Sequence, residues 1–176
     1  MRQALAVCVL LSVVQCAARS EATMAEPELR IKAMFLFNFA RFTTWPADVK
    51  PPFTFCVIGD DRLDRELQAV GQGRTVADLP IAVRYVPLPT QTSDCRVIYV
   101  GRAERNRTPQ IVRSVAGKSV LVVSEYPDAG RQGATINFFM EDDRMRFSVN
   151  LAAAADAGVS LSSNLLRLAR IAGNTK

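Results

Sequence analysis

Short runs of apolar residues alternate along the chain with stretches whose apolar residues recur every three to four positions. Runs of the first kind are typical of strands buried on both faces of a parallel sheet, and the second pattern is typical of helices that cover such a sheet. The predicted strands cover residues 53–58, 81–86, 96–100 and 119–124. The predicted helices cover residues 28–42, 62–70 and 108–115. This order predicts an α/β fold in which a mostly parallel sheet is flanked by helices.

The last third of the chain has the pattern of an antiparallel hairpin. Residues 134–140 and 144–150 form two apolar arms on either side of a Glu-Asp-Asp turn. Side chains alternate between the two faces of a strand, so the second arm has one buried face and one wet face. The wet face consists of Arg144, Arg146, Ser148 and Asn150.

Two terminal helices are predicted after the hairpin. Asn150 can cap the first, and Gly158 can end it. Ser160 or Ser162 can cap a final helix that reaches Ile171. The apolar stripe of this final helix would consist of Leu161, Leu165 and Leu168.

The first predicted helix, residues 28–42, carries apolar residues on more than one side. A helix of this kind is either deeply buried or shared with a partner. We expect its aromatic residues, and the tryptophan that follows them, to lie in the core, with a dimer contact as the alternative. These residues are Phe35, Phe39, Phe42 and Trp45.

The N-terminus has the layout of a secretory signal peptide, with one early arginine, an apolar run and then small residues. Cleavage after Ala18 fits the preference for small residues at the site, and cleavage after Ala22 is the alternative. We therefore predict a signal peptide over residues 1–18, a flexible segment over residues 19–27 and a single domain over residues 28–172. The apolar run is too short for a membrane span, so the mature protein is expected to be exported and soluble.

Two of the four cysteines leave with the predicted signal peptide, and Cys56 and Cys95 remain. In an oxidising compartment an even pair predicts a disulfide bond. A bond across a loop of about 40 residues would stabilise the fold by roughly 4 kcal/mol on the chain-entropy model. Two buried free thiols are the alternative.

The composition argues against several kinds of catalytic and metal-binding site. The chain contains no histidine, which removes the usual zinc ligand, the usual general base and the Ser-His and Cys-His nucleophile pairs. We expect no enzyme activity, no metal and no cofactor. The net charge of +5 indicates a solvated surface or a site for an anionic partner. Without a basic tract or an aromatic RNA-binding signature, nucleic-acid binding is not expected.

The first predicted strand ends in Gly59-Asp60-Asp61. This is not the glycine pattern of a dinucleotide site, and a phospho-acceptor site would need an aspartate where the chain has Ser124. We expect Asp60 or Asp61 to cap the next helix. A small-ligand cleft around Gly59, Gly101 and Ser124, beyond the strand ends, is an alternative.

Five segments resemble, in order, the YfiR-like family of periplasmic proteins. They read KAMFLFNFARFTTWP, FCVIGDD, CRVIYVG, GKSVLVVSE and INFFMEDDRMRFSVNLAAAADAGVSLSSNLLRLAR. The resemblance covers residues 31–170 and is most specific over residues 146–170.

The resemblance implies a periplasmic repressor that binds the periplasmic sensor domain of an inner-membrane diguanylate cyclase and keeps its cytoplasmic catalytic domain inactive. Repression would lower cyclic-di-GMP and biofilm formation. The resemblance further implies a homodimer, a disulfide between Cys56 and Cys95, and an outer-membrane, peptidoglycan-associated lipoprotein that sequesters the repressor. Some members have a second cysteine pair in the later region, which this chain lacks.

The candidate partner-binding surface is the wet face of the hairpin with two later arginines, and ordinary solvated charge is the alternative. Its residues are Arg144, Arg146, Ser148, Asn150, Arg167 and Arg170. Two other functions remain open. The chain could be an exported small-ligand-binding protein, or its client could be a membrane sensor kinase.

Overall fold

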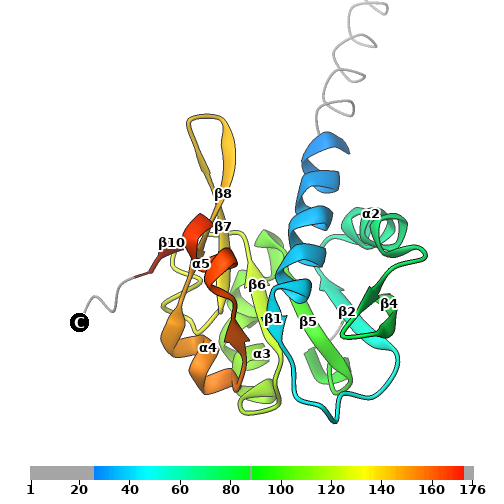
Figure 1. Ribbon diagram of the computed structural model, residues 1–176. Helices are drawn as coiled ribbons and strands as arrows, with labels where there is room; N and C mark the ends of the chain where they lie inside the picture. Colours follow the sequence, from blue (N-terminus) through cyan, green and yellow to red (C-terminus); the bar gives the residue numbers. More distant parts are fainter. Residues whose placement is uncertain (1–25, 88, 173–176) are drawn as a thin grey trace, which may run out of the picture.

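The computed structural model describes residues 26–87 and 89–172, and Figure 1 shows a mixed α/β fold around one curled sheet. The eight strands of this sheet lie in the order β10-β8-β7-β6-β5-β2-β4-β3. They are β2 (Phe53–Ile58), β3 (Thr75–Val76), β4 (Leu79–Tyr85), β5 (Cys95–Val100), β6 (Leu121–Ser124), β7 (Ile136–Glu141), β8 (Arg144–Val149) and β10 (Arg170–Ile171). A separate two-stranded ribbon pairs β1 (Thr43–Thr44) with β9 (Ser160–Leu161).

The described helices begin with one over residues 26–41. The later α-helices are α2 (Asp61–Gly71), α3 (Thr108–Val115), α4 (Leu151–Ala157) and α5 (Ser163–Leu168). Two 3₁₀ turns, η1 (Pro89–Gln91) and η2 (Arg102–Arg107), lie in the connections. No helix in the described part of the chain is long and apolar enough to cross a membrane. The predicted signal peptide lies outside the described residues.

The mostly parallel sheet is confirmed. Strands β4, β2, β5, β6 and β7 run parallel to one another in that spatial order. All six residues of β2 are buried, which explains why this strand is a continuous apolar run rather than an alternating one. The strand predicted over residues 119–124 begins only at Leu121, because Ser119 has a positive φ of 54° that no strand residue adopts.

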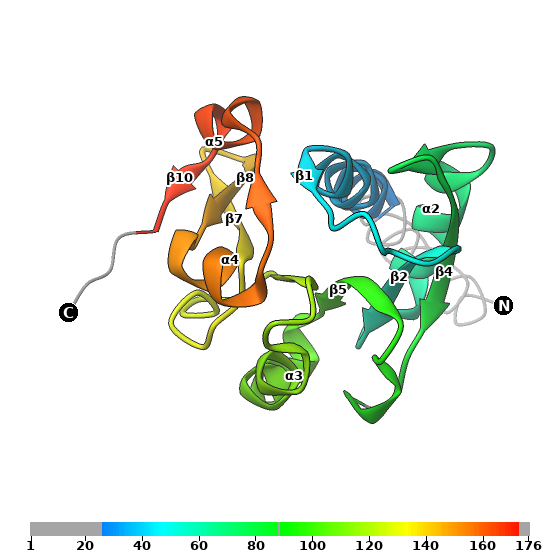
Figure 2. The same cartoon turned by 60° about the horizontal axis from the view of Figure 1, so that its bottom comes forward.

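Two apolar layers cover the two faces of the sheet, as Figure 2 shows. The helix of residues 26–41 and α2 lie on one face, where Leu36, Phe39 and Leu67 belong to the larger core cluster. On the opposite face, α3 contributes Ile111 and Val115 to a second cluster. Side chains of each strand alternate between these two layers.

Four phenylalanine rings join the first helix to the hairpin. Phe39 is fully buried, and its ring centroid lies 5.5 Å from that of Phe138 and 4.8 Å from that of Phe147. Phe35 touches the same two rings at 5.8 Å each. Burial of each such ring contributes about 1.5–3 kcal/mol. The core interpretation of this helix therefore holds for most of its aromatic residues, but Phe42 is 39 % exposed.

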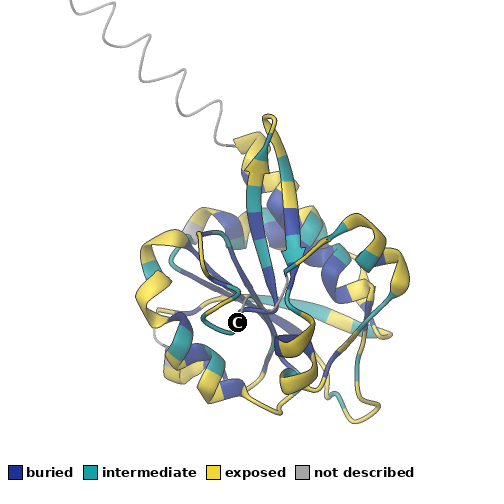
Figure 3. Cartoon of the chain, turned by 90° about the vertical axis from the view of Figure 1, so that its left-hand side faces the viewer, coloured by how far each residue is buried: buried dark blue, intermediate teal, exposed yellow. Residues whose placement is uncertain are grey.

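The hairpin of β7 and β8 is antiparallel, as predicted, and projects beyond the rest of the fold (Figure 3). Its turn residues Asp142 and Asp143 have positive φ values of 49° and 56°. Two successive left-handed residues are the geometry of the tight turn that matches strand twist, and aspartate tolerates it. We therefore assign Asp142 and Asp143 a structural role, which is to allow the backbone conformation of the turn.

Local caps explain several helix boundaries. The side chain of Asp60 accepts a hydrogen bond from the backbone N–H of Arg62 and caps α2. Asn150 caps α4, which ends at Gly158 in the left-handed conformation with φ of 73°. Both boundaries of α4 match the prediction.

The predicted final helix is wrong in its extent. Ser162 caps α5, as expected, but the helix ends at Leu168 rather than Ile171. Residues 170–171 instead form β10, which pairs in parallel with β8. Of the three leucines in the predicted stripe only Leu165 is buried, and Leu168 is 74 % exposed.

Candidate partner-binding surface

Three of the predicted arginines gather around one glutamate on the outer face of the hairpin. Arg144 lies opposite Glu141 in the β7–β8 register. The Nε atom of Arg146 lies 3.9 Å from a carboxylate oxygen of Glu141, and Arg170 of β10 forms an ion pair with the same carboxylate. We call Arg144, Arg146 and Arg170 the arginine cluster.

Aromatic contact fixes one member of the arginine cluster. The guanidinium of Arg170 lies 4.5 Å from the ring centroid of Phe139, which is close enough for a cation–π interaction. The ion pairs with Glu141 are exposed, and such pairs stabilise a fold little. Arg146 and Arg170 share the carboxylate of Glu141, and the exposed carboxylates of Asp142 and Asp143 lie in the turn next to Arg144, so this surface presents guanidinium groups among carboxylates.

The other predicted residues lie apart from this cluster or serve other contacts. Asn150 accepts from the N–H of Ala153 at 3.0 Å and donates to the carbonyl of Gly130 at 2.9 Å, so its amide holds α4 and a loop in place. Ser148 is half-buried between its register partners Asn137 and Arg170.

Arg167 belongs to α5, which lies against the opposite face of the sheet. Leu165 of this helix is in the same core cluster as Phe147 and Val149, whose side chains leave β8 away from Arg146. Arg167 donates to Asn164 on its own helix. The six predicted residues therefore do not form one continuous face.

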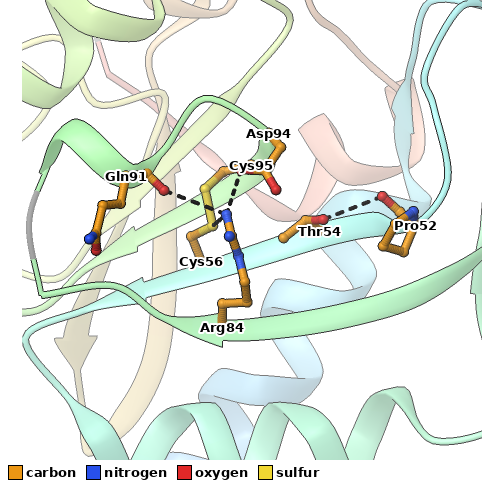
Figure 4. A network of polar contacts seen from close by, with 7 residues as sticks. All are labelled: Pro52, Thr54, Cys56, Arg84, Gln91, Asp94 and Cys95. Carbon is orange, nitrogen blue, oxygen red and sulfur yellow. Dashed lines mark hydrogen bonds and ion pairs between the residues drawn. A yellow bond between two sulfur atoms is a disulfide. The ribbon is translucent and has the colours of Figure 1, made fainter.

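The disulfide between Cys56 and Cys95 is present and joins the adjacent central strands β2 and β5 (Figure 4). Arg84 of β4 lies across it, with its Nη2 atom 3.9 Å from the Cys56 sulfur and 2.5 Å from Asp94. Both cysteines are buried, at 1 % and 0 % exposure. The bond is a structural link inside the fold rather than an exposed redox centre.

The small-ligand alternative concerned the strand ends around Gly59, Gly101 and Ser124. Gly59 has φ of 83°, and a Cβ atom placed on it would lie 2.6 Å from the Cγ of Glu104 in η2. A Cβ on Gly101 would lie 3.1 Å from the carbonyl oxygen of Gly59. Ser124 is buried and hydrogen-bonded to Asn137 at 3.1 Å. Protein atoms thus lie close against both glycines, and a ligand at this place stays a prediction.

A buried ionic cluster, which the sequence did not reveal, lies at the same end of the sheet. Lys32 is 6 % exposed and pairs with Glu28 at 2.7 Å and with Glu125. Burial opposes the charged form, but hydrogen bonds and charges from the two carboxylates outweigh it and raise the pKa of Lys32. Burial, reinforced by the charge of Glu125, raises the pKa of Tyr99 far above its ordinary value.

This ionic cluster holds the first helix to the end of β6. Lys32 and Glu28 come from the helix, and Glu125 directly follows β6. Within residues 26–87 and 89–172, no group of three or more histidine, cysteine, aspartate or glutamate side chains is placed to hold a metal ion.

Comparison with protein families gives a match over most of the described chain. A family model described as YfiR/HmsC-like matches residues 29–170. The match begins in the first helix and ends at β10, so it includes the disulfide, the hairpin and the arginine cluster. This family is periplasmic and regulatory rather than catalytic.

Proposed function

Because the chain belongs to the YfiR/HmsC-like family, we propose that it represses an inner-membrane diguanylate cyclase from the periplasm. In this proposal the protein binds the periplasmic sensor domain of the cyclase and keeps its cytoplasmic catalytic domain inactive, which lowers cyclic-di-GMP and biofilm formation. The observation that carries the proposal is the family match over residues 29–170.

Repression of this kind is a shift between two receptor conformations. A bound protein can inhibit only by binding the inactive conformation more tightly than the active one. The same linkage means that a second partner that competes for the repressor releases the cyclase. An outer-membrane, peptidoglycan-associated lipoprotein is the competitor that we propose, and a homodimer is the form in which we expect the repressor to act.

The arginine cluster is our candidate contact with the cyclase. Its guanidinium groups fit carboxylates on the sensor domain, and complementary charge sets the rate and specificity of association. Arg144 and Arg146 are exposed on the β7–β8 hairpin, and this hairpin projects beyond the rest of the fold (Figure 3).

The first experiment is a pull-down from solubilised membranes with the tagged mature chain, joined to a measurement of cellular cyclic-di-GMP. Deletion of the gene is expected to raise cyclic-di-GMP, and the triple variant Arg144→Ala/Arg146→Ala/Arg170→Ala is expected to restore repression only weakly. A cyclase should be recovered with the parent chain and lost with this variant.

The matched control is Arg62→Ala/Arg105→Ala/Arg113→Ala, which removes three exposed arginines from other parts of the surface. This control should repress like the parent. Unchanged cyclic-di-GMP after deletion would rule out a cyclase as the client. Recovery of a sensor kinase in the same pull-down would redirect the proposal to that receptor.

A further inference from the structure

Each edge of the main sheet ends in a two-residue strand. At one edge β10 covers only the last two residues of β8, and at the other β3 covers only the beginning of β4. The β3–β4 pairs are Thr75 with Pro80 and Val76 with Leu79. Beyond Pro80, no strand in the described part of the chain pairs with the outer side of β4. Figures 1 and 2 show β4 at the outside of the sheet with α2 beside it.

The backbone groups along this open edge point outward in a regular order. The N–H of Val86 donates to the carbonyl of Val57 in β2 at 2.8 Å. In a parallel ladder, alternate residues turn their N–H and C=O groups to the same neighbour. The outward groups are therefore those of Ile81, Val83 and Tyr85. Pro80 has no N–H, so the pairing of β3 with β4 there uses the N–H of Ile81, and the outward donors left over are those of Val83 and Tyr85. Such a row of free donors and acceptors is a template for another strand.

A groove of about 670 Å³ lies along this edge. Ile81 and Val83 of β4 line it, with Arg65 and Gln68 of α2 on one side and Arg74 at the end near β3. Ile81 and Val83 pair in register with Phe53 and Phe55, which places their side chains on the face that α2 covers.

The charged residues that line the groove are all positive. Arg65 and Arg74 both line it, and its lining contains no aspartate or glutamate. Among the side chains that the structure describes, which do not include that of Asp61, none forms an ion pair with either arginine. Arg74 is held by contact with the ring of Phe37, at 5.1 Å from its centroid.

We propose that this groove binds an extended acidic segment of a partner protein, which adds to the free edge of β4 as a further strand. Main-chain hydrogen bonds to Val83 and Tyr85 would supply affinity, as in other cases of strand addition. Carboxylates of the segment would pair with Arg65 and Arg74. The groove lies at the opposite end of the sheet from the arginine cluster, so this proposal does not depend on the proposed function.

A second copy of this chain fits the edge less well. Edge-to-edge pairing of two identical β4 strands would bring the arginines of the two grooves near each other. Like charges brought together in this way oppose association. A partner that carries carboxylates removes this repulsion.

The test uses the mature chain and a fluorescein-labelled peptide of alternating valine and glutamate. Fluorescence anisotropy measures its binding, and a peptide of alternating valine and lysine is the charge control. Amide hydrogen exchange by NMR reports the edge directly. The acidic peptide is expected to bind and to protect the N–H groups of Val83 and Tyr85, whereas the basic peptide does neither.

Two variants separate charge from backbone pairing. Arg65→Glu/Arg74→Glu should weaken binding of the acidic peptide by roughly tenfold or more. Arg62→Glu makes the same change on α2 outside the groove and should leave binding unchanged. Val83→Pro removes one outward N–H, which edge strands tolerate, and should also weaken binding.

Several results would overturn the proposal. Equal binding of the two peptides, unchanged exchange at the amides of Val83 and Tyr85, or no binding of the acidic peptide at millimolar concentration would each do so. A dimer that sedimentation detects and that Val83→Pro dissociates would assign the edge to a second copy instead. If Val83→Pro does not fold, the charge-reversal variant and the exchange measurement still decide.

Discussion

Lys32 shows how a single residue can escape interpretation from the sequence. It lies in a helix whose apolar residues occupy more than one side, and nothing in the local pattern indicates that its ammonium is buried. Its partner Glu125 is far away in the chain and comes close only through the fold. A buried charge is tolerated when it is paired and hydrogen-bonded, and here two carboxylates meet that condition.

Tyr99 gives a prediction for alkaline pH. The buried phenol has a raised pKa, so the folded protein keeps its proton at a pH where the unfolded chain loses it. Its contribution to stability is therefore complete below the ordinary tyrosine pKa of about 10 and declines above it. Tyr99→Phe should reduce the fall in the free energy of unfolding above about pH 10. Urea titrations across this range measure it.

The control for this prediction is Tyr85→Phe, because Tyr85 is 44 % exposed. That variant should follow the pH dependence of the parent. A Tyr99→Phe variant that loses stability at alkaline pH as steeply as the parent would assign the decline to other groups.

At the scale of elements, the long segments are predictable and the two-residue strands are not. The first helix, β2, β5, α3, the hairpin and α4 all follow from their apolar patterns or caps. In contrast, β1, β9 and β10 are too short to show an alternation of apolar and polar residues, and each exists only because another segment lies beside it. The helix was predicted to reach Ile171 because Leu161, Leu165 and Leu168 recur every three to four positions, which is the spacing of one face of a helix.

Asn150 gives a prediction at the scale of an element. Asn150→Ala removes the cap of α4 and the hydrogen bond to Gly130, and should lower the free energy of unfolding by about 1 kcal/mol or somewhat more. Asn150→Asp keeps the accepting oxygen but removes the donor, so it should cost less. Chemical denaturation measures both.

The matched control is Asn164→Ala in α5, where the asparagine is exposed. It should change the free energy of unfolding by less than about 0.5 kcal/mol. If Asn150→Ala were as harmless as this control, the cap would not determine the boundary of α4.

At the scale of the whole molecule, the sheet carries two separate candidate surfaces at its two ends. The arginine cluster lies at the hairpin end, and the open edge of β4 lies at the other. Between them, the disulfide joins β2 and β5 in the middle of the sheet. A regulator with two such surfaces can contact two partners, provided that the sheet between them stays folded.

The disulfide gives the prediction for the whole fold. Cys56 and Cys95 are 39 residues apart in the sequence, and the chain-entropy model assigns about 4 kcal/mol to a loop of this length. Cys56→Ala/Cys95→Ala should lower the free energy of unfolding by about this amount, as urea denaturation would measure.

A reductant distinguishes the stability lost with the disulfide bond from the stability lost because alanine packs differently from cysteine. The parent chain in dithiothreitol should approach the stability of the double variant, whereas the variant should not respond to reductant. A parent chain whose unfolding is the same with and without dithiothreitol would show that the bond contributes little.

The sequence by itself determined what depends on neighbouring residues: the buried strands, the hairpin, the cap at Asn150 and the even cysteine pair. It narrowed the cap of α2 to Asp60 or Asp61 and the cap of α5 to Ser160 or Ser162, and the structure selected Asp60 and Ser162. The sequence also carried the family resemblance. Tertiary structure alone decided the order of the strands, the short strands, the open edge of β4 and the pairing of Lys32 with Glu125. It also separated Arg167 from the arginine cluster. These features depend on contacts between residues distant in the chain, and local periodicity contains no information about which distant segments meet.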